Sequence, residues 1–366
     1  MRILFVGDYS NLHTTLVHEL RKMGHEAHIL SDKCGYMNLD TDYYLKREPG
    51  FKGGIKYLYN LFSLLPQLRD YDIVQLINPS FLKLKPAKIK YFYDRLKEQN
   101  KNMFLTLAGN DYHYVKACYD AKIFRFSEFK IGNNFSPGAI KNPELMYGWM
   151  SNSNKKLGEY IYETVTGGMA VLPEYDMVAK PILKDRVTFT NLPVDITELP
   201  KASNFVEGKI KIFVAMRSGV EHWKGTKLLY KLAQEIEKEM PDKVIIELAR
   251  DLPFQEFLSR MSKADIVLDQ LYAYSPAMTA LYGMGMGKVV ATGAQPEYYE
   301  YLGNSEHHPI FSVSPMDNDI KERLVNLINN RERILEMGQE AKLLVERYND
   351  SRVVADRFLS HWNNLI

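Results

Sequence analysis

Short apolar runs alternate with longer amphipathic segments along nearly the whole chain. The runs suit strands buried on both faces, and the segments between them carry apolar residues at helical spacing. In the first half the pattern predicts strands at residues 3–6, 27–30, 73–76, 104–107, 170–172 and 187–190, and helices near 12–23, 55–68, 87–99 and 156–164. The second half repeats the scheme, with strands at 210–214, 244–248, 266–269 and 289–291 and helices at 225–238, 253–261 and 320–329.

Such alternation is typical of parallel sheets that carry helices on both faces. The polar stretch 197–209 separates the two series and is the best candidate for a linker. We therefore predict an α/β protein with two doubly wound, Rossmann-like domains facing a cleft. The N-terminal domain is expected at 1–200 and the C-terminal domain at 201–345, with a last helix at 346–366 that can return to the N-terminal domain. These sheets bind ligands at the carboxyl ends of their strands, so the cleft is the expected site.

Composition excludes several classes of protein. The 366 residues are 46% hydrophobic and 25% charged, as in ordinary globular domains, and a formal net charge of +2 gives no preference for nucleic acid. Cys34 and Cys118 are the only cysteines, which favours a reducing compartment over a disulfide scaffold. No stretch approaches the roughly 20 apolar residues of a membrane span, and the first apolar run is too short for a signal peptide. We expect a cytoplasmic protein.

A glycine-rich run at 283–288 is the first hint of a ligand. It follows a strand, a loop and the start of a small-residue helix, and a junction of loop and helix can bind an anion through its backbone N–H groups. The run is neither the dinucleotide fingerprint nor a P-loop, because Lys288 is followed by Val289 and the first glycine position holds Tyr282. Its glycines alone therefore identify no ligand.

A basic pair upstream makes the hint more specific. Arg217 follows the predicted strand 210–214, and Lys224 precedes the next helix, so both cations are expected near the carboxyl end of one strand. An Arg fork and a Lys ammonium together suit a diphosphate, whose charge a single cation cannot neutralise. The alternative is a solvated loop with scattered charges.

Several short motifs follow one another along the chain. Those of the second half are Ala-Met-Arg217, Trp-Lys224-Gly225, Leu252-Pro-Phe with Glu256, Ala-Asp265-Ile-Val and Gly-Met-Gly287-Lys288-Val-Val. Those of the first half are Gly7-Asp8, Gly24-His-Glu26 and Asn191-Leu-Pro-Val-Asp195. In their order these motifs resemble those of GT-B glycosyltransferases, above all the large retaining family 4. The resemblance covers nearly the whole chain, and it implies that Arg217 and Lys224 hold the diphosphate of a nucleotide sugar.

The chain departs from this family at informative positions. Where the family has two glutamates eight positions apart, alignment through Gly287 places Tyr274 and Tyr282. A tyrosine hydroxyl forms hydrogen bonds but carries no charge at neutral pH, so the carboxylates expected near the ribose and the donor sugar are missing. The His-Gly pair that relatives often carry after the fourth strand is replaced by Ala108-Gly-Asn-Asp111, and His113 lies two residues further on.

Each candidate site residue also has a structural explanation. Asp111 is the best candidate for a general base or for positioning an acceptor, but it can equally cap the following helix, as can Asp8 and Ser275. Asp269 and Gln270 suit a supporting role or a plain turn. The expected catalytic residues are Asp111, Arg217 and Lys224. The expected donor-binding residues are Gly7, Asp8, Arg217, Lys224, Leu252, Tyr274, Ser275, Pro276, Ala277, Thr279 and Tyr282.

No metal or cofactor is expected. The pair Asp40 and Asp42 lacks a third ligand for a hard cation, and His307-His308 is too isolated for zinc. A lysine-rich segment at 83–101, which also holds apolar residues at helical spacing, is either a helix packed on the sheet or a peripheral contact with the inner face of a membrane.

Together these features predict a metal-independent glycosyltransferase that uses a UDP- or GDP-sugar. The acceptor is expected to be a saccharide or a lipid-linked saccharide of a surface polysaccharide, and retention is the habit of the family that the chain resembles. A non-hydrolysing sugar-nucleotide epimerase and a non-catalytic partner protein of the same fold are the alternatives. An NAD-dependent enzyme ranks lower, because no Gly-x-Gly-x-x-Gly follows the first strand.

Overall fold

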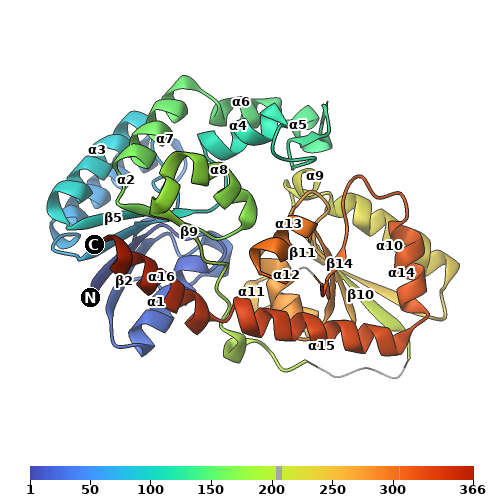
Figure 1. Ribbon diagram of the computed structural model, residues 1–366. Coiled ribbons are helices and arrows are strands. Elements are labelled where there is room, and N and C mark those ends of the chain that lie inside the picture. The colour runs from blue at the N-terminus through green and yellow to red at the C-terminus, as the bar shows by residue number, and fades with distance from the viewer. Residues whose placement is uncertain (203–207, 305) are drawn as a thin grey trace. The chain divides into compact units, whose positions relative to one another are not determined.

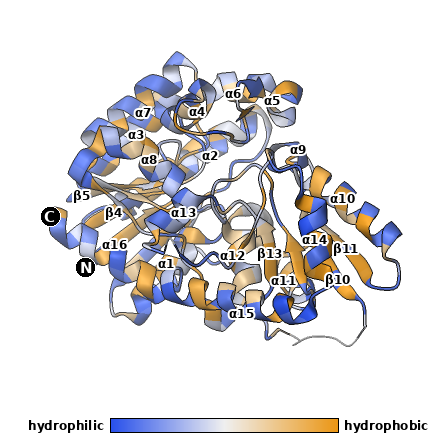
Figure 2. Cartoon of the chain, turned by 45° about the vertical axis from the view of Figure 1, so that its right-hand side comes forward, coloured by the Kyte–Doolittle hydropathy of each residue, from blue (hydrophilic) through white to orange (hydrophobic). Residues whose placement is uncertain are grey.

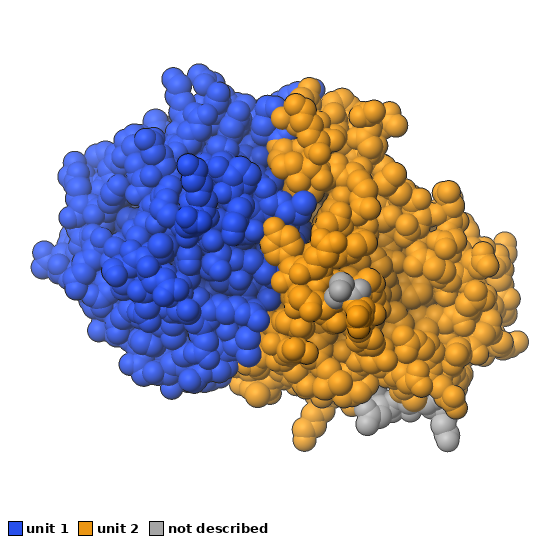
Figure 3. All heavy atoms as spheres, viewed as in Figure 1, with its two compact units in different colours: residues 1–116, 147–193, 351–366 blue, residues 117–146, 194–350 orange. Residues whose placement is uncertain are grey.

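The protein divides into two compact units (Figure 3). The computed structural model describes residues 1–202, 208–304 and 306–366. Unit 1 comprises residues 1–116, 147–193 and 351–366, and unit 2 comprises residues 117–146 and 194–350.

The division differs from the sequence-based boundaries by a few residues at 194–200 and 346–350, which belong to unit 2, and by one whole segment. Residues 117–146 lie within the first half of the chain, yet they belong to unit 2. The contacts that hold this segment join residues far apart in sequence, which local patterns do not reveal. The predicted linker at 197–209 includes residues 203–207, which lie outside the described residues.

Unit 1 is built on a seven-stranded sheet whose strands all run parallel (Figure 1). Their order is β3-β2-β1-β4-β5-β8-β9. The strands are β1 (Arg2–Val6), β2 (Glu26–Ser31), β3 (Tyr43–Tyr44), β4 (Ile73–Leu76), β5 (Asn102–Leu107), β8 (Gly167–Ala170) and β9 (Val187–Phe189). Central residues such as Phe5, Val74 and Leu105 are fully buried, as expected where helices cover both faces of a sheet.

Helices connect these strands, and the last helix of the chain also packs in unit 1. They are α1 (Leu12–Lys22), α2 (Gly50–Leu64), α3 (Pro86–Gln99), α4 (Tyr112–Asp120), α6 (Pro143–Trp149), α7 (Asn152–Thr164), α8 (Pro173–Leu183) and α16 (Ser351–Leu365), of which α4 and α6 cross the unit boundary. The α16 helix lies against α1, where the Ser351 hydroxyl donates a hydrogen bond to Glu19 at 3.2 Å. Its Trp362 is completely buried.

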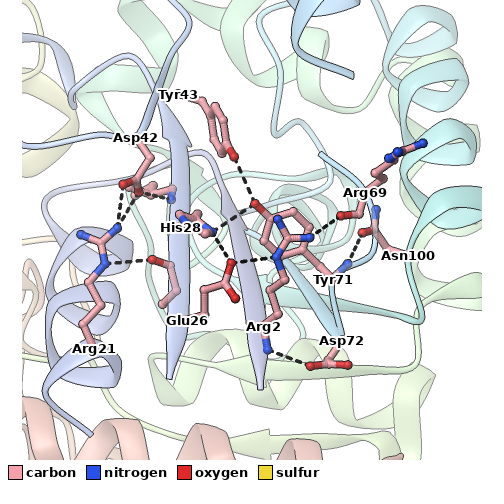
Figure 4. A network of polar contacts seen from close by, with 12 residues as sticks. Arg2, Arg21, Glu26, His28, Asp42, Tyr43, Arg69, Tyr71, Asp72 and Asn100 are labelled. Atoms are coloured by element: carbon pink, nitrogen blue, oxygen red, sulfur yellow. Dashed lines mark hydrogen bonds and ion pairs between the residues drawn. The ribbon is translucent and has the colours of Figure 1, made fainter. Parts of the chain in front are cut away.

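A network of charged and polar side chains holds the amino ends of the unit 1 strands (Figure 4). Arg2 pairs with Glu26 across β1 and β2 at 2.8 Å, and its backbone N–H donates to Asp72 at 2.7 Å. The Asp42 carboxylate accepts two hydrogen bonds from Arg21, at 2.7 and 2.8 Å. These groups pair with one another at the edge opposite to the carboxyl ends, so we assign them to the fold.

Unit 2 is built on a five-stranded parallel sheet of order β11-β10-β12-β13-β14. Its strands are β10 (Ile210–Met216), β11 (Val244–Arg250), β12 (Ile266–Leu268), β13 (Val289–Thr292) and β14 (Phe311–Ser312). The helices around it are α9 (Glu221–Lys224), α10 (Thr226–Glu239), α11 (Phe254–Met261), α12 (Met278–Gly285), α13 (Pro296–Tyr301), α14 (Ile320–Ile328) and α15 (Arg331–Tyr348). Apolar residues of α10, α14 and α15 pack in the core around the sheet, and Figure 2 shows hydrophobic and hydrophilic residues mixed along these helices.

The segment 117–146 adds a small subdomain to unit 2. It contains the antiparallel pair β6 (Lys130–Ile131) and β7 (Asn134–Phe135), followed by α5 (Pro137–Lys141). The α5 helix packs on α9, where an added methyl group at Gly138 would lie 2.6 Å from the Trp223 ring. We call residues 117–146 the inserted segment.

No helix within the described parts of the chain combines the length and hydrophobicity needed to cross a bilayer.

Candidate functional site

Arg217 and Lys224 lie at the carboxyl edge of the unit 2 sheet. Arg217 is the first residue after β10, its side chain is exposed, and Lys224 is the last residue of α9. Asp251, just after β11, accepts the N–H of Ser218 at 2.9 Å. Hydrogen bonds with the Ser218 side chain and backbone, and the positive charges of Arg250 and Arg217, hold the pKa of Asp251 below its usual range. The strand end therefore places both predicted diphosphate ligands at one edge, and their binding role stays a prediction.

A buried carboxylate lies close to Lys224. Asp269 follows β12, and its burial raises its pKa, while the charge of Lys224 and a 3.2 Å hydrogen bond from Thr292 oppose that rise. The Lys224 carbonyl accepts the N–H of Leu271 at 2.7 Å. Gly225 follows with φ of 70°, and a methyl group there would lie 2.7 Å from Leu271 Cβ. Only glycine fits this turn, which anchors the lysine beside the loop after β12.

The loop between β12 and α12 holds most of the other predicted donor-binding residues. Ser275 and Pro276 are buried, and Ala277 and Thr279 are partly exposed. The residue before α12 is Ala277, whose methyl side chain cannot accept a hydrogen bond from the first-turn amides. Those amides lack intrahelical acceptors, so this helix start suits an anion. Contact with a diphosphate remains a prediction for these residues.

The glycine run belongs to packing rather than to this anion site. Gly283 and Gly285 lie in the last turn of α12, at the opposite end from its first-turn amides. A methyl group on Gly283 would lie 2.9 Å from Val290, and one on Gly285 would lie 2.7 Å from Leu199. Gly287 has φ of 73° in the turn before β13. The glycines therefore allow close helix packing, and the anion-binding role of the loop-to-helix junction that precedes them stays a prediction.

Tyr274 anchors the inserted segment. Its hydroxyl oxygen accepts hydrogen bonds from the backbone N–H of Arg125 at 2.7 Å and from the Arg125 Nε at 3.2 Å. Phe124 and Phe126 contact its ring, with centroids 5.4 and 4.8 Å away. The Arg125 guanidinium continues to Glu297, at 3.0 Å to each carboxylate oxygen. Tyr274 therefore joins two segments of unit 2, and its place at a carboxylate position of the resembling family stays a prediction.

The second tyrosine of the pair packs in an apolar contact. Tyr282 lies on α12, is buried, and has its ring centroid 5.5 Å from that of Phe254, the first residue of α11. Leu252, two residues earlier, is half-buried. These three side chains line the connection between β11 and α11, and donor binding by Leu252 and Tyr282 stays a prediction.

Tyr274→Phe is expected to lower the free energy of unfolding of unit 2 by about 1–2 kcal/mol, because the part-buried N–H of Arg125 then lacks its acceptor. Urea unfolding measures the change. Tyr272→Phe is the matched control, since its hydroxyl bonds to no other residue that the structure describes. Equal midpoints for the two variants would contradict the anchoring role of Tyr274.

At the carboxyl end of β1 in unit 1, Gly7 and Asp8 shape the start of α1. Gly7 has φ of 83°, and a methyl group there would lie 2.4 Å from Ile77. Asp8 accepts the N–H of His13 at 2.9 Å, and the N–H and hydroxyl of Thr14 at 3.2 and 2.7 Å. Burial raises the pKa of Asp8, and these bonds act against it. The helix-capping alternative is therefore present in the structure, while donor contact by Gly7 and Asp8 stays a prediction.

A chain of buried hydrogen bonds links α1 to the C-terminal helix. His13 bonds through Nδ1 to the Gly7 carbonyl at 2.7 Å, and through Nε2 to the Thr106 hydroxyl at 2.9 Å. Gln75 donates to the same hydroxyl at 2.8 Å and accepts the indole N–H of Trp362 at 3.0 Å. Every donor finds an acceptor if His13 is neutral with its proton on Nδ1. These hydrogen bonds therefore connect four elements of unit 1 only while His13 is neutral.

His13 is expected to make unit 1 less stable in acid. Burial lowers the pKa of His13 to about 3 from 6.5, so between these values the unfolded chain binds a proton that the folded chain does not. Lowering the pH through this window should reduce the free energy of unfolding by up to about 1.4 kcal/mol per pH unit.

Denaturant unfolding near neutrality and near pH 5 measures this effect in the wild type and in His13→Gln. The variant should show the smaller loss on acidification, by up to about 2 kcal/mol. Asp8 titrates in both proteins, so its contribution cancels in the comparison. Identical pH dependence in the two proteins would show that His13 is not the group responsible.

Asp111 is the fourth residue after β5 and lies immediately before α4. Its Oδ1 accepts the N–H of Tyr114 at 2.8 Å, and its Oδ2 accepts the Tyr162 hydroxyl at 2.7 Å. Burial and the charge of Asp111 raise the pKa of Tyr162 far above 10.0, which keeps the phenol protonated. Capping by Asp111 is thus observed, and each carboxylate oxygen has a further lone pair for a second partner. A role as base or acceptor ligand stays a prediction.

His113 lies beside this carboxylate. Its ring centroid is 4.5 Å from that of Tyr162, and burial lowers its pKa although the charge of Asp111 opposes the shift. The neighbouring loop is held by Asn78, which donates to the carbonyls of Ala108 and Asn110 at 2.8 and 3.2 Å. Unit 1 therefore has a rigid polar turn at the carboxyl end of β5.

Sequence reasoning missed Arg125, Trp223, Glu297 and Tyr162. Arg125 meets Tyr274 across 149 residues of sequence, and no local pattern marks such a pair. The position of Tyr274 was singled out, but its partner could only be found in the fold.

The lysine-rich segment 83–101 contains α3, whose apolar residues Ile89, Phe92, Tyr93 and Leu96 are buried. Its lysines lie on the outer face, with the Lys90 ammonium 2.7 Å from Asp94. This arrangement is that of a helix packed on the sheet.

Comparisons with known proteins identify the fold. No family model and no curated protein matched the chain. Among solved structures, a sucrose-phosphate synthase from Thermosynechococcus elongatus superposes with a TM-score of 0.64 at 10% identity, over 100% of this chain and 99% of that one. HepE from Anabaena, in complex with UDP and glucose, gives 0.61 at 14% identity over 100% of both chains. The lipopolysaccharide outer core galactosyltransferase WaaB gives 0.53 at 13% identity over 100% of both. At such identities the likeness shows the fold alone, and the predicted GT-B fold is confirmed.

Proposed function

We propose that the protein is a glycosyltransferase that moves a sugar from a UDP- or GDP-sugar to a saccharide or lipid-linked acceptor. The observation that carries this proposal is the placement of Arg217 and Lys224 at the carboxyl edge of the unit 2 sheet, next to a helix start without a side-chain cap. Structural neighbours that share the fold include one solved with UDP and glucose, which supports the same donor class here.

In this mechanism the cations take up the charge of the departing nucleotide diphosphate. Arg217 would bind two phosphate oxygens through its planar fork, and the Lys224 ammonium would act as a point charge held near Asp269. The backbone N–H groups of Ser275 and Ala277, and those of the first turn of α12 from Met278, would complete the set. A donor of this kind contributes roughly 3–4 kcal/mol to the transition state. The chain's own cations can therefore do the work of a metal, and we propose a metal-independent reaction without a cofactor.

Asp111 is the proposed acceptor-side carboxylate. Its two hydrogen bonds fix its orientation at the carboxyl end of β5, where a sugar hydroxyl could be held or deprotonated. Gly7 and Asp8 would border the same unit's part of the site. We place the reaction in the cytoplasm, with a growing surface polysaccharide as acceptor, and expect retention at the anomeric carbon from the resemblance to family 4.

Mass spectrometry of UDP- and GDP-sugars incubated with and without oligosaccharide acceptors tests this proposal. A glycosyltransferase produces nucleoside diphosphate and an extended saccharide only when the acceptor is present, and the anomeric proton coupling of the product reports retention or inversion. An isomerised nucleotide sugar without acceptor would instead identify an epimerase.

Asp111→Asn should lower kcat by about 100-fold or more if the carboxylate acts as a base. Asp70→Asn, an exposed substitution in the same unit, is the control. Donor binding without any product would support the non-catalytic alternative, to which the tyrosines at 274 and 282 also point.

A further inference from the structure

The α2 helix of unit 1 carries a row of large apolar side chains on its outer face. The exposed fractions are 84% for Phe51, 55% for Ile55, 73% for Tyr59 and 49% for Phe62. Spacings of four, four and three residues place these side chains in one stripe along the helix. Contiguous exposed apolar surface of this kind is uncommon on a protein with no partner for it.

The opposite face of α2 is already in use. Gly53, Tyr57 and Leu61 are buried, and the Tyr57 hydroxyl accepts the backbone N–H of Lys83 at 3.2 Å. The helix is thus fixed on unit 1 through one face, so the stripe is a stable outward surface. It is not the inner face of a helix that has yet to pack.

The α3 helix extends this surface. It lies beside α2 (Figure 1), where the Phe62 ring centroid is 6.2 Å from that of Tyr91 and 5.0 Å from that of Phe92. Tyr91 is exposed and Phe92 is buried. We call the five exposed side chains the α2 patch: Phe51, Ile55, Tyr59, Phe62 and Tyr91.

Positive charge surrounds the α2 patch. The helix Gly50–Leu64 contains Lys52 and Lys56, both exposed, and no acidic residue. Lys88 and Arg95 are exposed on α3, and Arg95 lies over the Tyr91 ring at 5.3 Å.

The acids that face these cations are few. Glu48 lies 3.2 Å from Lys56, and Glu98 lies 2.7 Å from Arg95. Over residues 46–62 the chain has four cations and one acid. A cationic excess therefore remains beside the exposed aromatic rings.

We propose that the α2 patch binds the surface of an anionic lipid bilayer. Aromatic and aliphatic side chains on one face of a helix that contains lysines and no acid suit insertion at the boundary between headgroups and acyl chains. Lysine is depleted at protein–protein interfaces, so the same composition disfavours a protein partner. The inference is independent of the glycosyltransferase proposal. The membrane contact expected at 83–101 is thereby placed mainly on α2 instead. The α3 helix buries its own apolar face and contributes only Tyr91 and cations to the surface.

Co-sedimentation of the full chain with vesicles tests the proposal. Phosphatidylcholine vesicles are compared with vesicles that also contain phosphatidylserine. The wild type should bind the mixed vesicles and lose binding in high salt. The variant Phe51→Ser with Tyr59→Ser should bind at least about tenfold more weakly, and Lys52→Glu with Lys56→Glu should also bind weakly.

The matched control removes two exposed leucines from a helix of unit 2. The variant Leu335→Ser with Leu343→Ser on α15 also replaces two exposed apolar side chains by serine, but outside the α2 patch. It should leave vesicle binding unaltered. Circular dichroism of each variant confirms that the chain still folds. Absence of wild-type binding to the mixed vesicles, or equal loss in both pairs of variants, would overturn the proposal. Sedimentation velocity that shows a dimer dispersed by the α2 substitutions, without vesicle binding, would overturn it in favour of a second copy.

Discussion

Arg217→Ala is expected to weaken the binding of UDP or GDP by about 10- to 100-fold, because a charge-assisted hydrogen bond to phosphate contributes about 1.5–3 kcal/mol. The side chain is exposed just after β10, and thermal stability should therefore stay near that of the wild type. Isothermal titration calorimetry measures the affinity.

Two further variants make this result specific. Arg217→Lys keeps the charge but loses the planar fork, so its affinity should fall between those of the wild type and the alanine variant. Arg333→Ala removes a partly exposed arginine on α15 that pairs with Glu336 and Glu340, and it should leave affinity unchanged. Wild-type affinity in Arg217→Ala would show that the diphosphate binds elsewhere or not at all.

Trp362→Ala is expected to lower the free energy of unfolding of unit 1 by about 3–5 kcal/mol. The indole is completely buried, with centroids of Phe5, Phe104 and Phe358 at 6.2, 6.4 and 5.7 Å, and its N–H donates to Gln75. The loss combines a cavity with an unpaired amide oxygen. Urea unfolding followed by circular dichroism measures it.

Trp362→Phe separates the two contributions to that loss. It keeps an aromatic ring but leaves the Gln75 oxygen without its donor, which should cost about 1–3 kcal/mol. Asn364→Ala, exposed on the same helix, is the control. Trp223 stays in unit 2 as a fluorescent reporter for that unit. A Trp362→Ala protein as stable as the control would mean that α16 is not part of the unit 1 core.

Much of the fold could be predicted because its strands are short and apolar. The runs at 73–76 and 210–214 coincide with β4 and most of β10, and the alternation with helices identified parallel sheets. The two-residue strands β3 and β14 carry no periodicity and were missed. The strand predicted at 170–172 overlaps β8 only at Ala170. The prediction began too late because β8 begins with two glycines, which give no hydrophobic pattern.

Of the candidate site, the sequence predicted only the positions of residues that follow the carboxyl ends of strands. Arg217, Lys224 and Asp111 lie at carboxyl ends of strands, as their place in the alternation predicts. Asp8 and Asp111 show why such placement does not settle a role, since both carboxylates also accept helix-start amides. Gly283 and Gly285 make close packing contacts, and sequence alone does not separate this use of glycine from anion binding. Tyr274 could be flagged as a substitution, but its bond to Arg125 depends on the inserted segment.

The central claim is that unit 2 binds a nucleoside diphosphate at the edge that carries Arg217 and Lys224. Calorimetric titration of the wild type with UDP, GDP, UMP and GMP tests it most directly. We predict that one of the diphosphates binds at least about tenfold more tightly than its monophosphate, because the second phosphate engages the second cation. Equal affinity for mono- and diphosphates, or no binding of either diphosphate, would contradict the account.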